Sequence, residues 1–172
     1  MILRPALHSD IATLVPFART AFTDAFGHLY QPEDLAAFLD EYRAPTRYAD
    51  AIDDPAKAVT LAEEDGKLLG YATVDLASGF DERPDPQPRQ PATLAQLYCA
   101  SDATGRGVGA ALLDHAITSA RHRGCDVLQL SVYSENFGAQ RFYQRHGFAH
   151  VADIDFWVGR HRDDEFLYEL KL

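Results

Sequence analysis

Residues 104–110 read Thr104-Gly105-Arg106-Gly107-Val108-Gly109-Ala110, and this glycine-rich turn decides how the rest of the chain is interpreted. An apolar, strand-like segment (residues 94–99) precedes it, and a segment with helical patterning (residues 108–122) follows it. The free N–H groups and the dipole at the start of such a helix attract anions. Glycines remove the Cβ atoms that would keep a diphosphate away from the backbone, and Arg106 adds a cation. The turn therefore predicts a site for a diphosphate-containing ligand.

Strand and helix patterns alternate on both sides of this turn. The expected strands are residues 2–4, 58–62, 68–74, 94–99, 127–132, 148–153 and 166–172. The expected helices are residues 11–26, 32–44, 108–122 and 135–146, with a short helical turn at residues 46–54. The proline-rich residues 77–91 are expected to form a loop. One strand–turn–helix–strand unit implies a single parallel crossover, and the flanking hairpins make the sheet a mixed one. The fold class is therefore α/β.

The bulk properties limit the classes of protein that remain. A length of 172 residues predicts one domain over residues 1–172. The net charge of −10 argues against nucleic acid as a partner and mildly favours a cationic substrate. No signal peptide and no apolar run of about 18 residues is present, so we expect no membrane association and a cytoplasmic location. Cys99 and Cys125 are expected to be buried, reduced thiols, although Cys99 precedes the glycine turn closely enough to face a ligand.

Several ligands are compatible with a glycine turn of this kind. The Gly-Lys-Ser/Thr ending of a phosphate-binding P-loop is absent. The spacing of Gly105, Gly107 and Gly109 formally fits a dinucleotide-binding fingerprint, with Asp126 as the acid about 20 residues on. However, Asp126 precedes its strand and so belongs at the opposite end of the sheet. Nicotinamide-dependent redox chemistry is therefore disfavoured. No metal site is expected, since Gly147 would break a helix that carried both His146 and His150.

Residues 97–113 resemble motif A of the GCN5-related N-acetyltransferases (the GNAT family), with Thr104 at a position usually held by Gln or Arg. Residues 131–148 resemble motif B of the same family, including Asn136, Ala139, Phe142 and Tyr143. Residues 20–26, 30–35 and 156–159 are similar to bacterial spermidine/spermine acetyltransferases of the Pai type. The resemblance implies a single GNAT domain with a mixed, mostly antiparallel sheet of about seven strands, a central parallel pair that splays apart, and about four helices. It also leaves a homodimer open.

The resemblance assigns roles to particular residues. Acetyl-CoA would be the cosubstrate, its pantetheine arm pairing with the backbone of Leu97, Tyr98 and Cys99. Its diphosphate would lie on the turn; the residues concerned are Gly105, Arg106, Gly107, Val108, Gly109 and Ala110. Asn136 would hydrogen-bond the pantetheine arm or cap the next helix, and Ala139 would leave room for the arm. Tyr143 would be the general acid that protonates the departing sulfur, or else a core aromatic residue.

The general base and the acceptor are less well determined by the sequence. Residues 93–99 contain no acid, and Gln96 cannot accept a proton at neutral pH. Asp24, His28 and Glu33 are candidate bases, each also readable as a surface residue. The expected function is transfer of acetyl from acetyl-CoA to a primary amine of a small molecule, a polyamine being the leading acceptor, by direct attack in a ternary complex. The alternative is a non-catalytic acyl-CoA-binding module.

Overall fold

One seven-stranded sheet runs through the computed structural model, which describes residues 1–172. The strand order is β1-β2-β3-β4-β5-β7-β6, and only β4 and β5 run parallel. The bounds are β1 Ile2–Pro5, β2 Lys57–Glu64, β3 Lys67–Asp75, β4 Pro91–Cys99, β5 Val127–Tyr133, β6 Ala149–Val158 and β7 His161–Lys171. The mixed, mostly antiparallel sheet with a central parallel pair is therefore confirmed.

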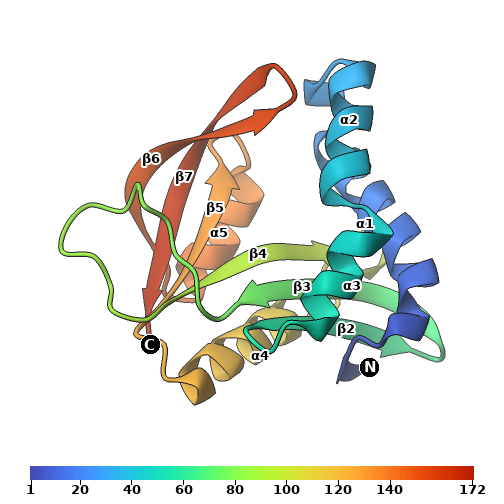
Figure 1. Ribbon diagram of the computed structural model, residues 1–172, viewed down its shortest axis with the longest axis horizontal. Helices are drawn as coiled ribbons and strands as arrows, with labels where there is room; N and C mark the ends of the chain where they lie inside the picture. Colours follow the sequence, from blue (N-terminus) through green and yellow to red (C-terminus); the bar gives the residue numbers. More distant parts are fainter.

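Five α-helices flank the sheet (Figure 1). They are α1 Ile11–Phe26, α2 Pro32–Tyr42, α3 Pro45–Asp53, α4 Val108–Arg123 and α5 Phe137–Arg145. The helix α3 occupies residues for which the sequence predicts only a short turn. Pro45 ends α2 and also supplies the fixed φ that suits the first turn of the next helix, so the chain starts a new helix at once. None of these helices combines the length and the apolar character that crossing a bilayer requires.

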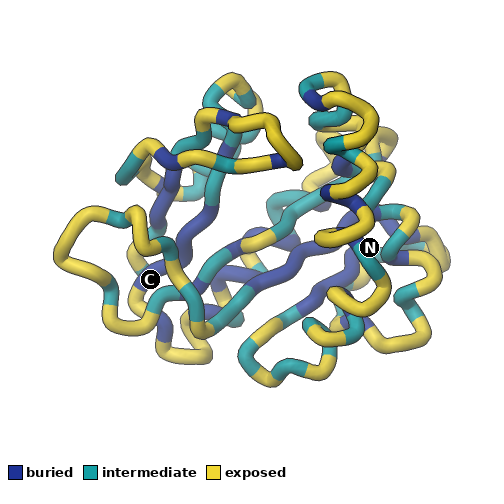
Figure 2. The backbone as a smooth tube through the Cα atoms, turned by 45° about the horizontal axis from the view of Figure 1, so that its top comes forward, coloured by how far each residue is buried: buried dark blue, intermediate teal, exposed yellow.

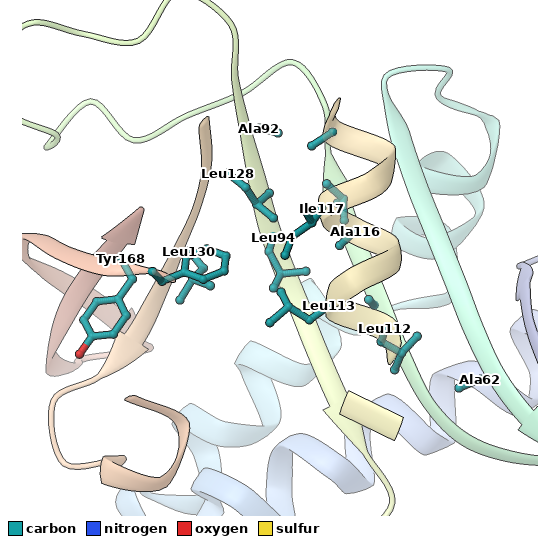
Figure 3. Close-up of a cluster of buried hydrophobic side chains, with 14 of the residues drawn as sticks. Ala62, Ala92, Leu94, Leu112, Leu113, Ala116, Ile117, Leu128, Leu130 and Tyr168 are labelled. Carbon is teal, nitrogen blue, oxygen red and sulfur yellow. The ribbon is translucent and has the colours of Figure 1, made fainter. Parts of the chain in front are cut away.

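The two faces of the sheet carry different helices. Figure 3 shows the largest apolar cluster, in which Leu112, Leu113, Ala116 and Ile117 of α4 pack beside β4 and β5. On the other face, α1 and α3 pack over β2 and β3. Adjacent strand residues point to opposite faces, so Tyr71 lies in the cluster beneath α1 and α3 while its neighbour Ala72 lies in the α4 cluster. The sheet is therefore covered on both faces.

A β-bulge in β4 changes which side chains face each layer. Thr73 of β3 pairs with Gln96, and Val74 pairs with Leu94, so Ala95 is an extra residue. As a result, Leu94 and Leu97 both reach the α4 cluster despite their odd spacing, while Tyr98 packs on the face of α1. Simple alternation along the sequence does not predict this change.

The two central strands separate soon after they meet. Residues 91–93 of β4 pair with residues 127–129 of β5, and no pairing continues beyond them. Residues 94–99 of β4 therefore have no strand partner on the side of β5. The loop between β3 and β4 is largely exposed (Figure 2), as predicted, and Arg83 anchors it through a two-pronged ion pair with Glu169.

The hairpin of β6 and β7 is longer than the sequence predicts. The predicted strands end at residue 153 and begin at residue 166, whereas the observed strands continue to Val158 and start at His161. The extension has no apolar alternation in the sequence, because its exposed side carries charged residues. Arg162 forms ion pairs there with Asp155 (2.6 Å) and Asp164 (3.0 Å). The tip of the hairpin lies beside α2 (Figure 1), where the Arg160 N–H donates to Asp34 Oδ1 at 3.3 Å.

Candidate active site

A cavity of about 550 Å³ opens where β4 and β5 diverge. Residues 94–99 and 130–133 of the two separated strands line its middle. One part of its wall, here named the α5 half, consists of Thr104, Asn136, Ala139 and Tyr143. Another part, here named the hairpin half, includes Phe22, Tyr30, Arg43, Phe156 and Glu165. The gap between the strands therefore connects groups from both layers of helices in one space.

The glycine turn leads from β4 into α4 with unusual backbone geometry. Gly105 and Gly107 each have φ of +80°, a conformation that residues with a Cβ rarely adopt, and a Cβ at either position would meet no atom within 4 Å. The first N–H of α4 with a backbone acceptor is that of Ala111, which donates to Gly107. The N–H groups of Val108, Gly109 and Ala110 thus have no backbone acceptor.

The remaining residues of the turn behave differently from one another. Val108 is buried in the α4 cluster, so only its backbone can contact a ligand. Arg106 is exposed and forms an ion pair with Glu64 at the end of β2. That pair lowers the pKa of the Glu64 carboxyl. Arg106 must therefore leave or share Glu64 to contact an anion on the turn.

The α5 half contains the residues expected from motif B. The side chain of Asn136 caps α5, accepting from the Ala139 N–H at 3.1 Å, and it also lines the cavity. Tyr143 packs its ring against Phe142 and Phe148 while lining the cavity beside Ala139. Burial raises the pKa of the Tyr143 hydroxyl, so this group is a protonated donor at neutral pH. The capping role of Asn136 and the packing role of Tyr143 are both observed, and neither conflicts with a ligand contact.

Leu97, Tyr98 and Cys99 all line the cavity on the unpaired edge of β4. All three pair with β3 on their other edge, and no strand pairs with them on the side of β5. Cys99 is a free thiol whose pKa is raised by burial, so it stays protonated and is a poor nucleophile near neutral pH. Cys125 is buried and free, as expected.

Gln96 has a structural role on the face of α3. Its Oε1 accepts hydrogen bonds from the hydroxyls of Tyr71 (2.8 Å) and Tyr48 (3.0 Å). Both tyrosines are buried, so Gln96 satisfies two hydroxyls that would otherwise be costly to bury. This structural role accounts for an amide at position 96 of β4, in the segment that contains no candidate general base.

Glu165 on β7 is a cavity residue that the sequence patterns do not indicate. Its Oε2 is buried and has no hydrogen-bond partner in the protein. Burial raises the pKa of its carboxyl, opposed by a hydrogen bond from Ser131 and assisted by the nearby Asp163. A carboxylate of raised pKa that faces a cavity can accept a proton from a ligand. Glu165 lies just outside the strand predicted at residues 166–172, so no periodicity marks it as inward-facing.

The three candidate bases from the N-terminal region are not in this cavity. Asp24, His28 and Glu33 are exposed, and none of them lines the wall. Asp24 lines a neighbouring groove that also includes Lys67. Glu165 lines the cavity, and the carboxylates of Asp24 and Glu33 do not.

Tyr30 of the hairpin half is hydrogen-bonded to β7. The Tyr30 hydroxyl donates to Asp163 Oδ2 at 2.5 Å, and His161 Nε2 lies 3.0 Å from Asp163 Oδ1. Asp163 is buried, and the hydroxyl of Tyr30 therefore supplies a donor that the carboxylate requires. This contact joins the segment after α1 to β7.

Arg43, directly after α2, is the second cavity residue that the sequence does not indicate. Its side chain is buried with the guanidinium carbon 5.2 Å from the ring centre of Phe22, 5.5 Å from that of Phe38 and 5.9 Å from that of Tyr98. Nη1 donates to the Tyr42 carbonyl at 3.2 Å, and Nε is buried without a partner. Three aromatic rings therefore stack around a buried cation.

Asp126 lies far from the glycine turn along the sheet. Its carboxylate accepts the backbone N–H groups of Arg89 (2.8 Å) and Gln90 (3.2 Å) just before β4 begins. The turn follows the other end of β4. Asp126 is thus in the wrong place to bind the ribose of a dinucleotide on the turn, in agreement with the sequence argument.

Comparison with known proteins gives a consistent result. Residues 18–148 match the profile of the acetyltransferase (GNAT) family. An uncharacterised N-acetyltransferase of Mycobacterium tuberculosis is 30% identical over 159 residues, which cover 92% of this chain and 96% of that one. One of Lactobacillus delbrueckii subsp. lactis is 27% identical over 95% of this chain and 92% of its own length. The crystal structure of PaiA N-acetyltransferase from Thermoplasma acidophilum, a complex with coenzyme A, shares the fold with a TM-score of 0.79 at 20% identity, covering 99% and 98% of the two chains.

Proposed function

The chain belongs to the acetyltransferase (GNAT) family and is an acetyl-CoA-dependent N-acetyltransferase, and from this premise we propose that the cavity between β4 and β5 is its active site. The acceptor would be a primary amine of a small molecule. The observation that carries the proposal is the single cavity at the point where β4 and β5 separate, lined by Tyr143 on one side and Glu165 on the other.

Acetyl-CoA fits the residues that are present on the α5 side. Unpaired N–H groups of Val108, Gly109 and Ala110, with open space at Gly105 and Gly107, suit a diphosphate. The further residues that we propose to hold the cosubstrate are Leu97, Tyr98, Cys99, Arg106, Asn136, Ala139 and Tyr143. When bound, acetyl-CoA supplies the thioester whose acetyl group is transferred. The backbone edge of β4 then orients the ligand, because no strand competes for it.

Two side chains would move the protons. Glu165 accepts a proton from the acceptor's ammonium group, which has an ordinary pKa near 10 and must be neutral to attack. Its raised pKa brings it closer to that of the amine than an exposed carboxylate would be. The Tyr143 hydroxyl donates a proton to the departing sulfur. Cys99 is not required to carry the acetyl group. Because its raised pKa keeps the thiol protonated and weakly nucleophilic, direct transfer from acetyl-CoA to the amine is favoured.

Polyamines are one subclass of the proposed acceptors. The Pai-type resemblance, the net charge of −10 and the carboxylate of Glu165 support an acceptor that carries positive charge. Arg43 on the same wall does not support a molecule that carries amines alone. Spermidine and spermine therefore belong in the test as one arm beside other primary amines.

Release of free thiol from acetyl-CoA, measured over a panel of amines, tests the proposal. We expect turnover with at least one primary amine and none with tertiary amines, whose neutral form has no N–H to lose once the nitrogen has attacked the thioester. Binding of acetyl-CoA by calorimetry without turnover across the panel would instead favour a non-catalytic acyl-CoA-binding module.

A further inference from the structure

Three charged side chains are buried in the protein, and only one of them, Arg43, has no oppositely charged side chain beside it. Glu169 is bound by Arg83, and Asp163 by Tyr30 and His161. Arg43 forms no ion pair with any carboxylate. A buried guanidinium without an ion-pair partner is energetically unfavourable, because it cannot lose its proton and burial removes the hydration of its charge.

The aromatic rings around Arg43 offset only part of this cost. Stacking with Phe22, Phe38 and Tyr98 uses the faces of the guanidinium. Its five N–H donors lie along the edge of the group, and the Tyr42 carbonyl and the Tyr98 hydroxyl each accept a hydrogen bond from it. The rings thus hold the guanidinium in a fixed orientation while leaving donors for another acceptor.

A second uncompensated charge lines the same cavity. Glu165 has a buried, unpartnered Oε2 and forms no ion pair with Arg43 or with any other cation. The cavity therefore presents one unpaired cation and one unpaired carboxylate that do not neutralise each other. Opposite charges at two places on one wall are complementary to a ligand that carries both charges itself.

Resting on the proposed function, we infer that Arg43 binds an anionic group of the acceptor, so that the acceptor is an amino acid or a similar amine bearing a carboxylate. The ammonium of this ligand faces Glu165 and loses a proton to it, and the carboxylate accepts hydrogen bonds from Arg43. Planar, forked recognition of carboxylate is the chemistry for which arginine is best suited. The apolar groups nearby, Phe22, Phe26 and Phe156, leave space for an apolar side chain or linker.

Matched pairs of acceptors test this inference. L-amino acids and ω-amino acids are assayed beside the amines that lack their carboxylate, with spermidine as a third arm, on the wild-type enzyme and on Arg43→Met. We expect the wild type to prefer the acid-bearing member in kcat/KM by about 30-fold or more. In Arg43→Met we expect this preference to be lost, so that the kcat/KM values of the two members of a pair differ by less than about threefold.

Arg47→Met is the matched control. Arg47 also stacks on an aromatic ring, that of Tyr42, but it is exposed and outside this cavity, so the preference is retained. Arg43→Lys keeps the charge without the fork and is expected to fall between the wild type and Arg43→Met. Melting temperature and CoA affinity establish that each variant is folded.

A second readout separates this inference from the proposed function. Stabilisation by the non-acetylated acceptors is measured by thermal shift in the presence of CoA. Stabilisation by acid-bearing amines that Arg43→Met abolishes supports the inference even without turnover, in which case the proposed function alone fails. Turnover of spermidine or plain amines without carboxylate preference, or an equal loss for both members of each pair, overturns the inference and leaves acetyl transfer intact. The absence of both turnover and stabilisation contradicts both.

Discussion

Tyr143 can be tested by removing a single oxygen atom. Its ring packs on Phe142 and Phe148, and phenylalanine preserves that packing. A general acid contributes about 10²–10⁴-fold to a rate. We therefore expect Tyr143→Phe to lower kcat about 100-fold with little change in the KM for acetyl-CoA, as measured by thiol release at saturating amine. An unchanged melting temperature would show that the fold is intact, and a variant as active as the wild type would remove Tyr143 from the mechanism.

We expect the ionised Glu165 carboxylate to reduce the stability of the fold at the pH at which it supports activity. Its pKa is raised by burial from an ordinary value of 4.5, so the folded protein holds this proton more tightly than the unfolded chain does. The stabilisation from the protonated group is complete below pH 4.5 and is lost as pH rises through the raised pKa. Glu165→Gln cannot ionise, so we expect a higher melting temperature than wild type at pH 7.5 and no such gain near pH 4.

The same variant is expected to lose activity. A missing general base lowers kcat/KM by about 100-fold, and the rise of wild-type activity with pH that follows ionisation of Glu165 disappears from the profile. The conservative change to Asp shortens the side chain but retains a titrating group, so Glu165→Asp should preserve that limb at a lower rate. Equal pH profiles for the wild type and Glu165→Gln would be evidence against a proton-accepting role.

At the scale of elements, the start of α4 can be compared with the turn between β2 and β3. Gly105 and Gly66 have similar φ (+80° and +77°), and a Cβ at either position would meet no atom within 4 Å. Each change to alanine should therefore cost about 1–2 kcal/mol of unfolding free energy through backbone strain alone. Only Gly105→Ala places a methyl group where the diphosphate is proposed to lie. We expect it to raise the KM for acetyl-CoA about tenfold, while Gly66→Ala leaves that KM unchanged.

Elements with strong local signals are predictable from the sequence, and those with charged surfaces are less so. The helix predicted to start at residue 108 begins there, and the asparagine expected to cap the following helix does so through Asn136. By contrast, the ends of β6 and β7 carry Asp155, Arg162 and Asp164. These residues pair with each other across the exposed side, which no alternation of apolar residues reveals.

At the scale of the whole molecule, the α5 half of the cavity is predictable and the hairpin half is not. Asn136 and Tyr143 lie within one motif next to their own helix. Arg43 and Glu165 are 122 positions apart, the first within the helix predicted at residues 32–44 and the second directly before the strand predicted at residues 166–172, and no pattern marks either of them. They line one cavity because α2 and the β6–β7 hairpin pack beside each other, which is a property of the tertiary fold. The candidate bases Asp24, His28 and Glu33 are therefore in the N-terminal helical region, whereas the carboxylate that lines the cavity is on β7.

The hydrogen bond from Tyr30 to Asp163 tests whether this packing shapes the acceptor side. Hydrogen bonds to charged groups contribute about 1.5–3 kcal/mol, so Tyr30→Phe should lower the free energy of unfolding by about 2 kcal/mol. Since the bond holds β7 against the segment after α1, the KM for the amine should rise several-fold. The KM for acetyl-CoA should not change, because the glycine turn and α5 lie elsewhere. Tyr42→Phe is the control, since this ring is exposed and keeps its packing on Phe38. A parallel rise of both KM values would mean that the hairpin supports the whole cavity and not one half.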